Sequence, residues 1–236
     1  MQTSPYASFA SNPVRGIFGV LAWPRTYLNV AYLMIGFPIG LAYFVFYVTA
    51  GALGAGLAIL GIGLVILFLL VLAAWALAHF ERGLANTLLG ADVAPPPPTA
   101  VEEGGWPWIK SVFANPVTWK GLVFQLLKFP LGLASWIVTV VVISVVGGFV
   151  AAPIVIALGG TIQIDPWWVA DAPGEAWIAT VIGLVAVVPA LHLLNGIAYL
   201  WAMFARLMLG RREPREPVRE SWSPEPVRAP VPVIGS

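Results

Sequence analysis

The sequence has no cysteine and very few charged residues. Without cysteine the chain can form neither a disulfide nor a thiolate metal site, and it has no thiol nucleophile. Charged residues make up only 10% of the chain and hydrophobic residues 59%, which is far from the composition of a soluble domain. The sequence also lacks a Ser/His/Asp set, a Gly-rich phosphate loop and a carboxylate pair within its apolar runs. We therefore expect no enzyme activity, no cofactor, no metal and no nucleic-acid partner.

Long apolar runs occupy most of the chain. A helix needs about 20 residues to cross about 30 Å of hydrocarbon, and runs of this kind lie at about 26–50, 57–78, 117–156 and 176–203. The third run is longer than one crossing, and Lys120 and Lys128 predict that it enters the hydrocarbon near Phe129. Two shorter segments rich in aromatic residues, 14–23 and 106–113, are typical of helices that lie on a membrane surface. The sequence predicts an all-α integral membrane protein with four transmembrane helices and short interfacial helices.

One short motif occurs twice. Gly36-Phe37-Pro38-Ile39-Gly40-Leu41-Ala42 returns 92 residues later as Lys128-Phe129-Pro130-Leu131-Gly132-Leu133-Ala134. Between segments 24–45 and 116–137, 7 of 22 positions are identical. A fixed offset of this kind indicates duplication of one supersecondary unit.

The duplication divides the chain into five parts. We expect a flexible N-terminus at 1–13, a first repeat at 14–90, a Pro/Glu-rich linker at 91–105, a second repeat at 106–210 and a disordered Pro/Arg/Glu tail at 211–236. Each repeat would contribute one interfacial helix and two spans.

The basic residues predict the orientation. All 12 Lys and Arg fall before the first span, between residues 79 and 128, or from residue 206 onward, whereas the 157–177 segment has three acids and no base. The positive-inside rule then makes both termini cytoplasmic. Each repeat would leave and re-enter the cytoplasmic side, so the two pairs of helices would be parallel.

The repeated motif supplies the first candidate residues. Pro38 and Pro130 lack an amide donor and should bend their helices, and Gly40 and Gly132 allow a neighbouring helix to approach closely. The four residues could form a hinge or a ligand cleft, or they could be packing notches that only assemble the helices.

Ionisable and aromatic residues supply the others. His192 falls deep within the last span, with Asn195 on the same helical face, so it is either functional or a neutral histidine bonded to another helix. A haem between His79 and His192 is disfavoured because the two residues lie at different depths. Glu81 and Arg82 should pair with each other or with the second repeat where their helix leaves the lipid. Trp167 and Trp168 suit a ligand platform or an aromatic membrane anchor.

The motifs resemble a known family. Residues 32–44, Phe80-Glu81-Arg82-Gly83-Leu84 and 126–132 are similar to the putative sensor domain of bacterial membrane histidine kinases. The resemblance covers about residues 15–210 and implies four membrane helices in two duplicated pairs. That domain usually precedes a kinase, but no phosphoacceptor-histidine helix follows Arg206 here. The resemblance therefore implies a stand-alone sensor.

Three functions follow from these observations. We expect a non-catalytic sensor-like protein of the bacterial inner membrane that binds another membrane protein, or a second copy of itself, through its helices or tail. The alternative is an accessory subunit of a larger respiratory, photosynthetic or transport complex. A small transporter ranks third because few polar residues could form its path.

Overall fold

The computed structural model describes residues 19–94, 105–164 and 168–210, and within them the chain is almost entirely helical. Four long helices dominate: α2 (Pro24–Gly56), α3 (Ile62–Leu84), α5 (Pro116–Val150) and α7 (Pro173–Leu209). A π-helical turn, η3 (Ala85–Leu89), extends α3. The shorter elements are η2 (Ala58–Leu60), α4 (Gly105–Ala114), α6 (Ala152–Ala157) and the strands β1 (Ile162–Ile164) and β2 (Trp168–Ala170).

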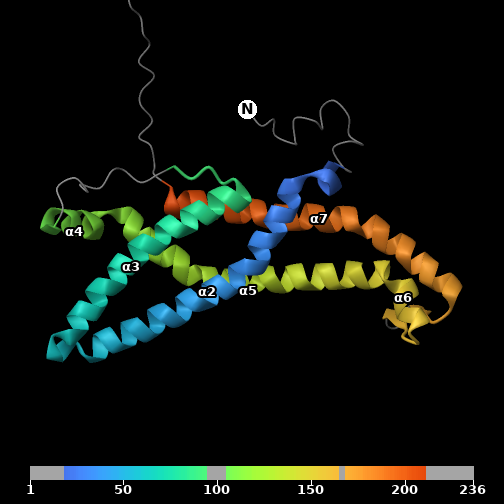
Figure 1. The fold of residues 1–236 in the computed structure, drawn as a ribbon, viewed down its shortest axis with the longest axis horizontal. Coiled ribbons are helices and arrows are strands. Elements are labelled where there is room, and N and C mark those ends of the chain that lie inside the picture. Colours follow the sequence, from blue (N-terminus) through green and yellow to red (C-terminus); the bar gives the residue numbers. More distant parts are fainter. Residues whose placement is uncertain (1–18, 95–104, 165–167, 211–236) are drawn as a thin grey trace, which may run out of the picture.

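The long helices form two hairpins that cross. α2 and α3 make the first hairpin, α5 and α7 make the second, and α2 crosses α5 near the centre of the molecule (Figure 1). The turn between α2 and α3 and the segment around α6 both lie at the lower edge of the view. The ends of α3 and α7 and the start of α5 lie toward the upper edge. Both hairpins therefore turn on the same side of the molecule.

Local sequence explains where the helices begin and turn. α2, α5 and α7 each start with a proline, whose missing amide is one that a first helical turn leaves unbonded in any case. The Asn115 side chain caps α5 by accepting a hydrogen bond from the Val117 amide at 2.9 Å. Between α2 and α3, Gly61 has a φ of 76°, a left-handed conformation that glycine adopts without strain.

The predicted number of long apolar helices is confirmed. Four helices are long and apolar enough to cross a membrane: Pro24–Gly56, Ile62–Leu89, Pro116–Val150 and Pro173–Leu209. The first was expected to end near residue 50, but it continues to Gly56. The glycines and alanines within 51–56 do not end the helix. In an apolar environment, a helix that ended before them would leave backbone amide and carbonyl groups without hydrogen bonds. The third apolar run is divided after Val150, where α6 begins.

Two connecting segments have structure of their own. Between α6 and α7, β1 and β2 pair antiparallel, with Ile162 opposite Ala170 and Ile164 opposite Trp168. At the start of the expected 91–105 linker, Ala91 and Val93 are buried in the main core. They pack there because Asn86 bonds both the amide and the carbonyl of Val93, which folds the chain back onto η3.

The expected surface segments are described in part. A helix is present at α4, where 106–113 was expected to lie on the membrane surface. Of the segment 14–23, only residues 19–22 are seen as helix. The expected flexible N-terminus, the linker from 95 to 104 and the tail at 211–236 lie outside the described residues.

The first helices of the two hairpins bury matching positions. Each of the eight buried residues of α5 lies 92 positions after a buried residue of α2. The matched pairs include Tyr32 with Phe124 and Gly40 with Gly132. α3 and α7 show a second correspondence, at an offset of 120: Gly63, Ala78, Ala85 and Leu89 match the identical and equally buried Gly183, Ala198, Ala205 and Leu209.

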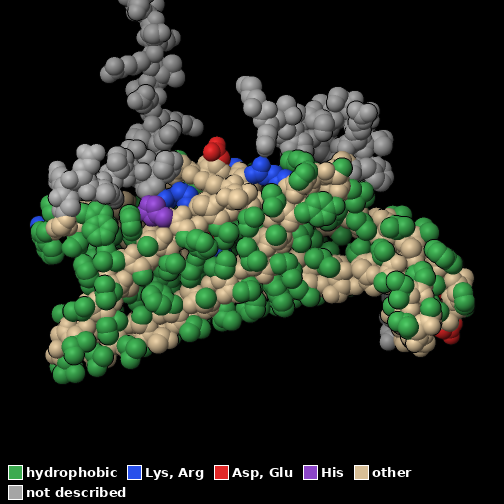
Figure 2. Space-filling view, viewed as in Figure 1, with side chains coloured by type: hydrophobic (Ala, Val, Ile, Leu, Met, Phe, Trp, Pro, Cys, Tyr) green, Lys and Arg blue, Asp and Glu red, His purple; other side chains and the backbone are tan. Residues whose placement is uncertain are grey.

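The outer surface of the helices is apolar. Large hydrophobic side chains are exposed along all four, among them Val45, Leu64, Val145 and Val185. In the space-filling view they cover the flank of the molecule, whereas the visible Lys, Arg and His side chains gather at its upper edge (Figure 2). Such a surface suits a lipid environment better than water.

Candidate functional site

A buried ion pair joins the two hairpins. The Lys128 ammonium, from α5, lies 2.5 Å from the Glu81 carboxylate, from α3, and neither side chain has any exposed surface. Charged groups so far from water are stable only when they are paired and hydrogen-bonded. A pair of this kind among apolar helices is therefore a candidate functional element.

The ion pair is incompletely satisfied. Lys128 lies over the Tyr32 ring, 5.1 Å from its centroid, which adds a cation–π contact. Within the described residues, however, Glu81 Oε1 and the hydroxyls of Tyr32 and Tyr43 have no hydrogen-bond partner. Buried polar atoms usually do have partners, and those that do not often mark a strained or functional place. Two hydroxyl donors and one carboxylate acceptor thus remain available at the centre of the molecule.

A second polar contact lies beside the pair. Tyr47 donates its hydroxyl hydrogen to Gln125, and the Gln125 amide donates to the Ala74 carbonyl at 3.1 Å. These bonds connect α2, α5 and α3. Together, Glu81, Lys128, Tyr32, Tyr43 and the Tyr47–Gln125 contact form what we call the central polar cluster.

The hairpins approach most closely at the repeated motif. A Cβ atom placed on Gly40 would lie 2.7 Å from the Lys128 carbonyl oxygen, and one on Gly132 would lie 3.1 Å from the Gly36 carbonyl oxygen. Because Gly36 and Lys128 occupy equivalent places in the two motifs, the contacts are reciprocal. The two glycines therefore lie where α2 and α5 approach closely.

The aromatic side chains at this crossing follow the same reciprocity. Phe37 and Phe129, which are equivalent in the two motifs, stack with their ring centroids 6.3 Å apart. Phe37 also contacts Trp136 at 5.3 Å, and Phe129 contacts Phe44 at 4.7 Å. Phe44 and Trp136 are themselves equivalent. The crossing thus has nearly the same surroundings when viewed from either hairpin.

The charges break this equivalence. Lys128 stands where the first motif has Gly36, and Trp201 of α7 stands where α3 has Glu81. Trp201 uses its indole nitrogen to donate to the Ser135 hydroxyl at 3.1 Å. The buried ion pair is therefore present on one side only of an otherwise matched scaffold.

Arg82, the neighbour of Glu81, has a different partner. Its guanidinium donates from Nη2 to the Leu209 carbonyl at 3.0 Å and from Nε at 3.4 Å. Leu209 ends α7, where the helix dipole is negative and favours a cation. Glu81 and Arg82 were expected to pair with each other or with the second repeat. Both contact the second repeat, through different residues.

The structure places the remaining candidates away from this cluster. His192 lies on an exposed part of α7. Asn195 bonds to α2: its amide donates to Thr26 at 3.1 Å, and its oxygen accepts from Asn29 at 2.8 Å. Asn195 therefore links α7 to α2, and the hydrogen bonds that it forms are to α2 and not to His192.

The remaining candidate residues from the sequence are two prolines and two tryptophans. Pro38 and Pro130 lie inside α2 and α5, each two residues before its close-approach glycine. Trp168 begins β2, far along the chain from the central polar cluster, and Trp167 lies outside the described residues. The structure brings together Glu81, Gly40 and Gly132, and it leaves His192 and Trp168 elsewhere.

The surroundings of Lys128 could not be read from the sequence. The residue was expected to lie where its helix enters the hydrocarbon, and the structure shows that its side chain is fully buried within the protein. The charge is held inside the protein because Glu81 of α3 offers a partner there. One signal could have revealed this: Lys128 replaces a glycine in a motif that otherwise marks the closest helix contact.

The fold and the site define an all-helical protein with two crossing hairpins and a buried ion pair between them. The family model described as putative sensor matches residues 32–209, and the chain belongs to that family. The resemblance predicted from the motifs is thus confirmed, and family membership suggests a sensor role. No curated protein and no solved structure matches the chain.

Proposed function

We propose that the chain is a non-catalytic sensor embedded in the bacterial inner membrane, which passes its signal to a partner protein. The observation that carries this proposal is the buried Glu81–Lys128 pair, placed where the two hairpins cross. In a low-dielectric interior the energy of such a pair depends strongly on small changes in geometry. A signal that moves one hairpin relative to the other would therefore alter the central polar cluster.

Membrane insertion and duplication are part of the proposal. The four apolar helices and their exposed hydrophobic side chains support insertion. The matched buried positions and the reciprocal contacts of Gly40 and Gly132 support two parallel duplicated pairs. Hairpin turns on one side and basic residues on the other support cytoplasmic termini (Figures 1 and 2).

The orientation can be tested with single cysteines, since the chain has none of its own. Ala170→Cys, in β2, should react with an impermeant maleimide added to intact cells. Ala100→Cys should react only after the cells are opened. Labelling of position 100 from outside would refute the orientation.

The partner is proposed to be another membrane protein or a second copy of this chain. Mild-detergent purification from native membranes should recover it, and the double variant Glu81→Gln/Lys128→Met should change its recovery while Gly36→Ala does not. Gly36→Ala is a fair control because an added Cβ there meets nothing within 4 Å. If the double variant recovers as much of the partner as the unchanged protein does, the central polar cluster plays no part in signalling to that partner.

The same purification distinguishes the alternative. Recovery of a large complex at fixed stoichiometry, unaffected by the cluster variants, would instead make the chain an accessory subunit. Deleting residues 216–236 tests where the partner binds: lost recovery assigns docking to the tail, and full recovery assigns it to the helices.

A further inference from the structure

The first turn of α5 holds the end of α4 by two side-chain hydrogen bonds. The Trp119 indole donates to the Phe113 carbonyl at 3.0 Å, and the Thr118 hydroxyl donates to the Val112 carbonyl at 2.8 Å. Both carbonyls lie in the last turn of α4, where a helix leaves its carbonyl groups without partners of their own. The two helices therefore form a fixed corner, residues 105–120, which we call the α4–α5 elbow.

The first repeat has an equivalent corner. At an offset of 92 from the bond of Trp119, the Tyr27 hydroxyl donates to the Leu21 carbonyl at 2.8 Å. Residues 19–22 are helical there, as α4 is in the second repeat. Both short helices lie at the upper edge of the molecule in Figure 1. The corner thus recurs at the offset that relates α2 to α5, and each time it places a short helix on the same side of the molecule.

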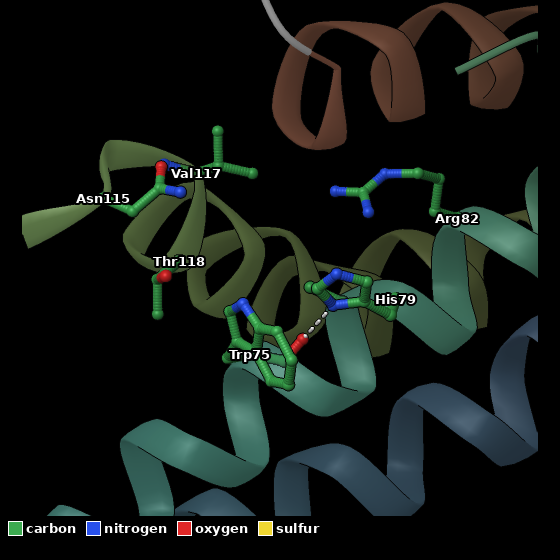
Figure 3. A pocket seen from close by; sticks show the side chains of 7 residues that line it. Trp75, His79, Arg82, Asn115, Val117 and Thr118 are labelled. Atoms are coloured by element: carbon green, nitrogen blue, oxygen red, sulfur yellow. Dashed lines mark hydrogen bonds between the residues drawn. The ribbon is translucent and has the colours of Figure 1, made fainter. Parts of the chain in front are cut away.

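Aromatic contacts also fix α4 to α3. Trp108 packs edge-on against Trp75, and Phe113 stacks on Phe68, in both cases with ring centroids 5.6 Å apart. Figure 3 shows Trp75 beside the start of α5, where Thr118 lies. One side of α4 is therefore covered by α3, and the helix cannot turn about its axis without losing these contacts.

The rest of the elbow exposes aromatic and basic side chains. Trp106 is 65% exposed and Trp119 is 48% exposed. Lys110 is exposed and lies over the Trp106 ring, 5.6 Å from its centroid, and Lys120 is half-buried in the second turn of α5. Indole rings and lysines of this kind gather at the membrane–water boundary, where the ring leaves water and the ammonium stays in it.

No acidic residue of the elbow neutralises these lysines. The chain contains no Asp or Glu from Gly105 to Ile164, and within the described residues neither Lys110 nor Lys120 forms an ion pair. The two charges are therefore available to an anion. The exposed indole rings favour a lipid surface over a soluble anion, because a soluble anion would leave them in water.

We propose that the α4–α5 elbow binds the anionic phospholipid headgroups of the membrane surface. Lys110 and Lys120 attract the headgroup phosphates, and Trp106 and Trp119 enter the headgroup layer beside them. The proposal rests on the membrane insertion proposed above and gives the sensor a class of signal, the charge of the membrane surface. Lys128 lies about two turns after Lys120 on the same helix, so a movement of the elbow reaches the central polar cluster through α5.

The test uses the full-length protein in phosphatidylcholine vesicles, with one fluorescent reporter on an introduced cysteine. Ala114→Cys places the reporter at the exposed end of α4, and Ile59→Cys places it in η2 at the opposite edge, where Ile59 is 96% exposed. Energy transfer is measured to phosphatidylglycerol and to phosphatidylcholine, each carrying the acceptor dye on an acyl chain and added at the same low mole fraction. We expect more transfer to phosphatidylglycerol at position 114 and equal transfer to the two lipids at position 59.

The lysines provide matched variants. Lys110→Gln and Lys120→Gln remove charges from side chains that are not buried, so both variants should fold. Each should lower the preference for phosphatidylglycerol about fivefold. Lys110→Arg keeps the charge and should keep the preference. About 1 M salt should abolish the preference, because it shortens the screening length to about 3 Å.

Two results would overturn the proposal. One is equal transfer to the two lipids at position 114, and the other is a preference that Lys110→Gln/Lys120→Gln leaves unchanged. Either result in protein recovered from the membrane fraction removes the lipid site and leaves the sensor proposal intact. Absence of the protein from the membrane fraction would overturn both proposals.

Discussion

Replacing Gly40 with alanine should weaken the crossing of the two hairpins. The added Cβ would lie 2.7 Å from the Lys128 carbonyl oxygen, 2.8 Å from its carbon and 2.9 Å from Phe129 Cα. All three are backbone atoms of a long helix, so no flexible side chain can move aside. α2 and α5 would have to separate, which would also disturb the central polar cluster.

The size of the effect follows from two opposing terms. Alanine is favoured over glycine within a helix by about 1 kcal/mol, whereas overpacking of a tight contact costs about 1–3 kcal/mol. Gly36→Ala should receive only the first term, because its Cβ meets nothing within 4 Å. The difference between the two variants should therefore be about 1–3 kcal/mol. At about 2–4 °C per kcal/mol for a chain of this size, Gly40→Ala should melt several degrees below Gly36→Ala.

The assay compares melting temperatures of the purified variants in one detergent. Gly132→Ala should fall between the other two, since its Cβ would lie 3.1 Å from the Gly36 carbonyl oxygen, tight but within reach of a small shift. Gly36→Ala controls for the general effect of alanine in the same motif. If Gly40→Ala melts at or above Gly36→Ala, the close packing of α2 on α5 is refuted.

Two further predictions concern the central polar cluster. Lys128→Met should destabilise the protein by about 3–5 kcal/mol because it leaves the Glu81 carboxylate buried without its partner. Glu81→Gln/Lys128→Met should recover much of this loss. Equal melting temperatures for the single and double variants would contradict this prediction. Tyr47→Phe should cost about 1 kcal/mol through loss of its bond to Gln125, and Tyr43→Phe should cost less, because no hydrogen bond of good geometry holds its hydroxyl within the described residues. The same melting assay measures this pair of variants, and a larger loss for Tyr43→Phe would show that its hydroxyl has a partner.

The local pattern predicted the elements because it depends only on neighbouring residues. Runs of more than 20 apolar residues must be helical if they lie in lipid, since no other local structure bonds every amide. The motifs around Phe37 and Phe80 likewise sufficed to indicate the family. The offset of 92 between α2 and α5 is visible in the sequence, but the offset of 120 between α3 and α7 is not. The connection that holds α6, β1 and β2 is longer than the turn between α2 and α3, so equivalent residues of the second helices lie further apart along the chain.

By itself, then, the sequence determined the helical class, the four long apolar helices, the repeated crossing motif and the family. Tertiary structure alone decided the partners of the charges. Lys128 looked like a surface residue because its neighbours along the chain offer no counter-charge, yet Glu81, 47 positions away, meets it when the hairpins cross. Arg82 likewise finds its carbonyl partner 127 positions away, at the end of α7. The energy of a charge depends on what surrounds it in space, and only the packing of α3 against α5 and α7 supplies those surroundings.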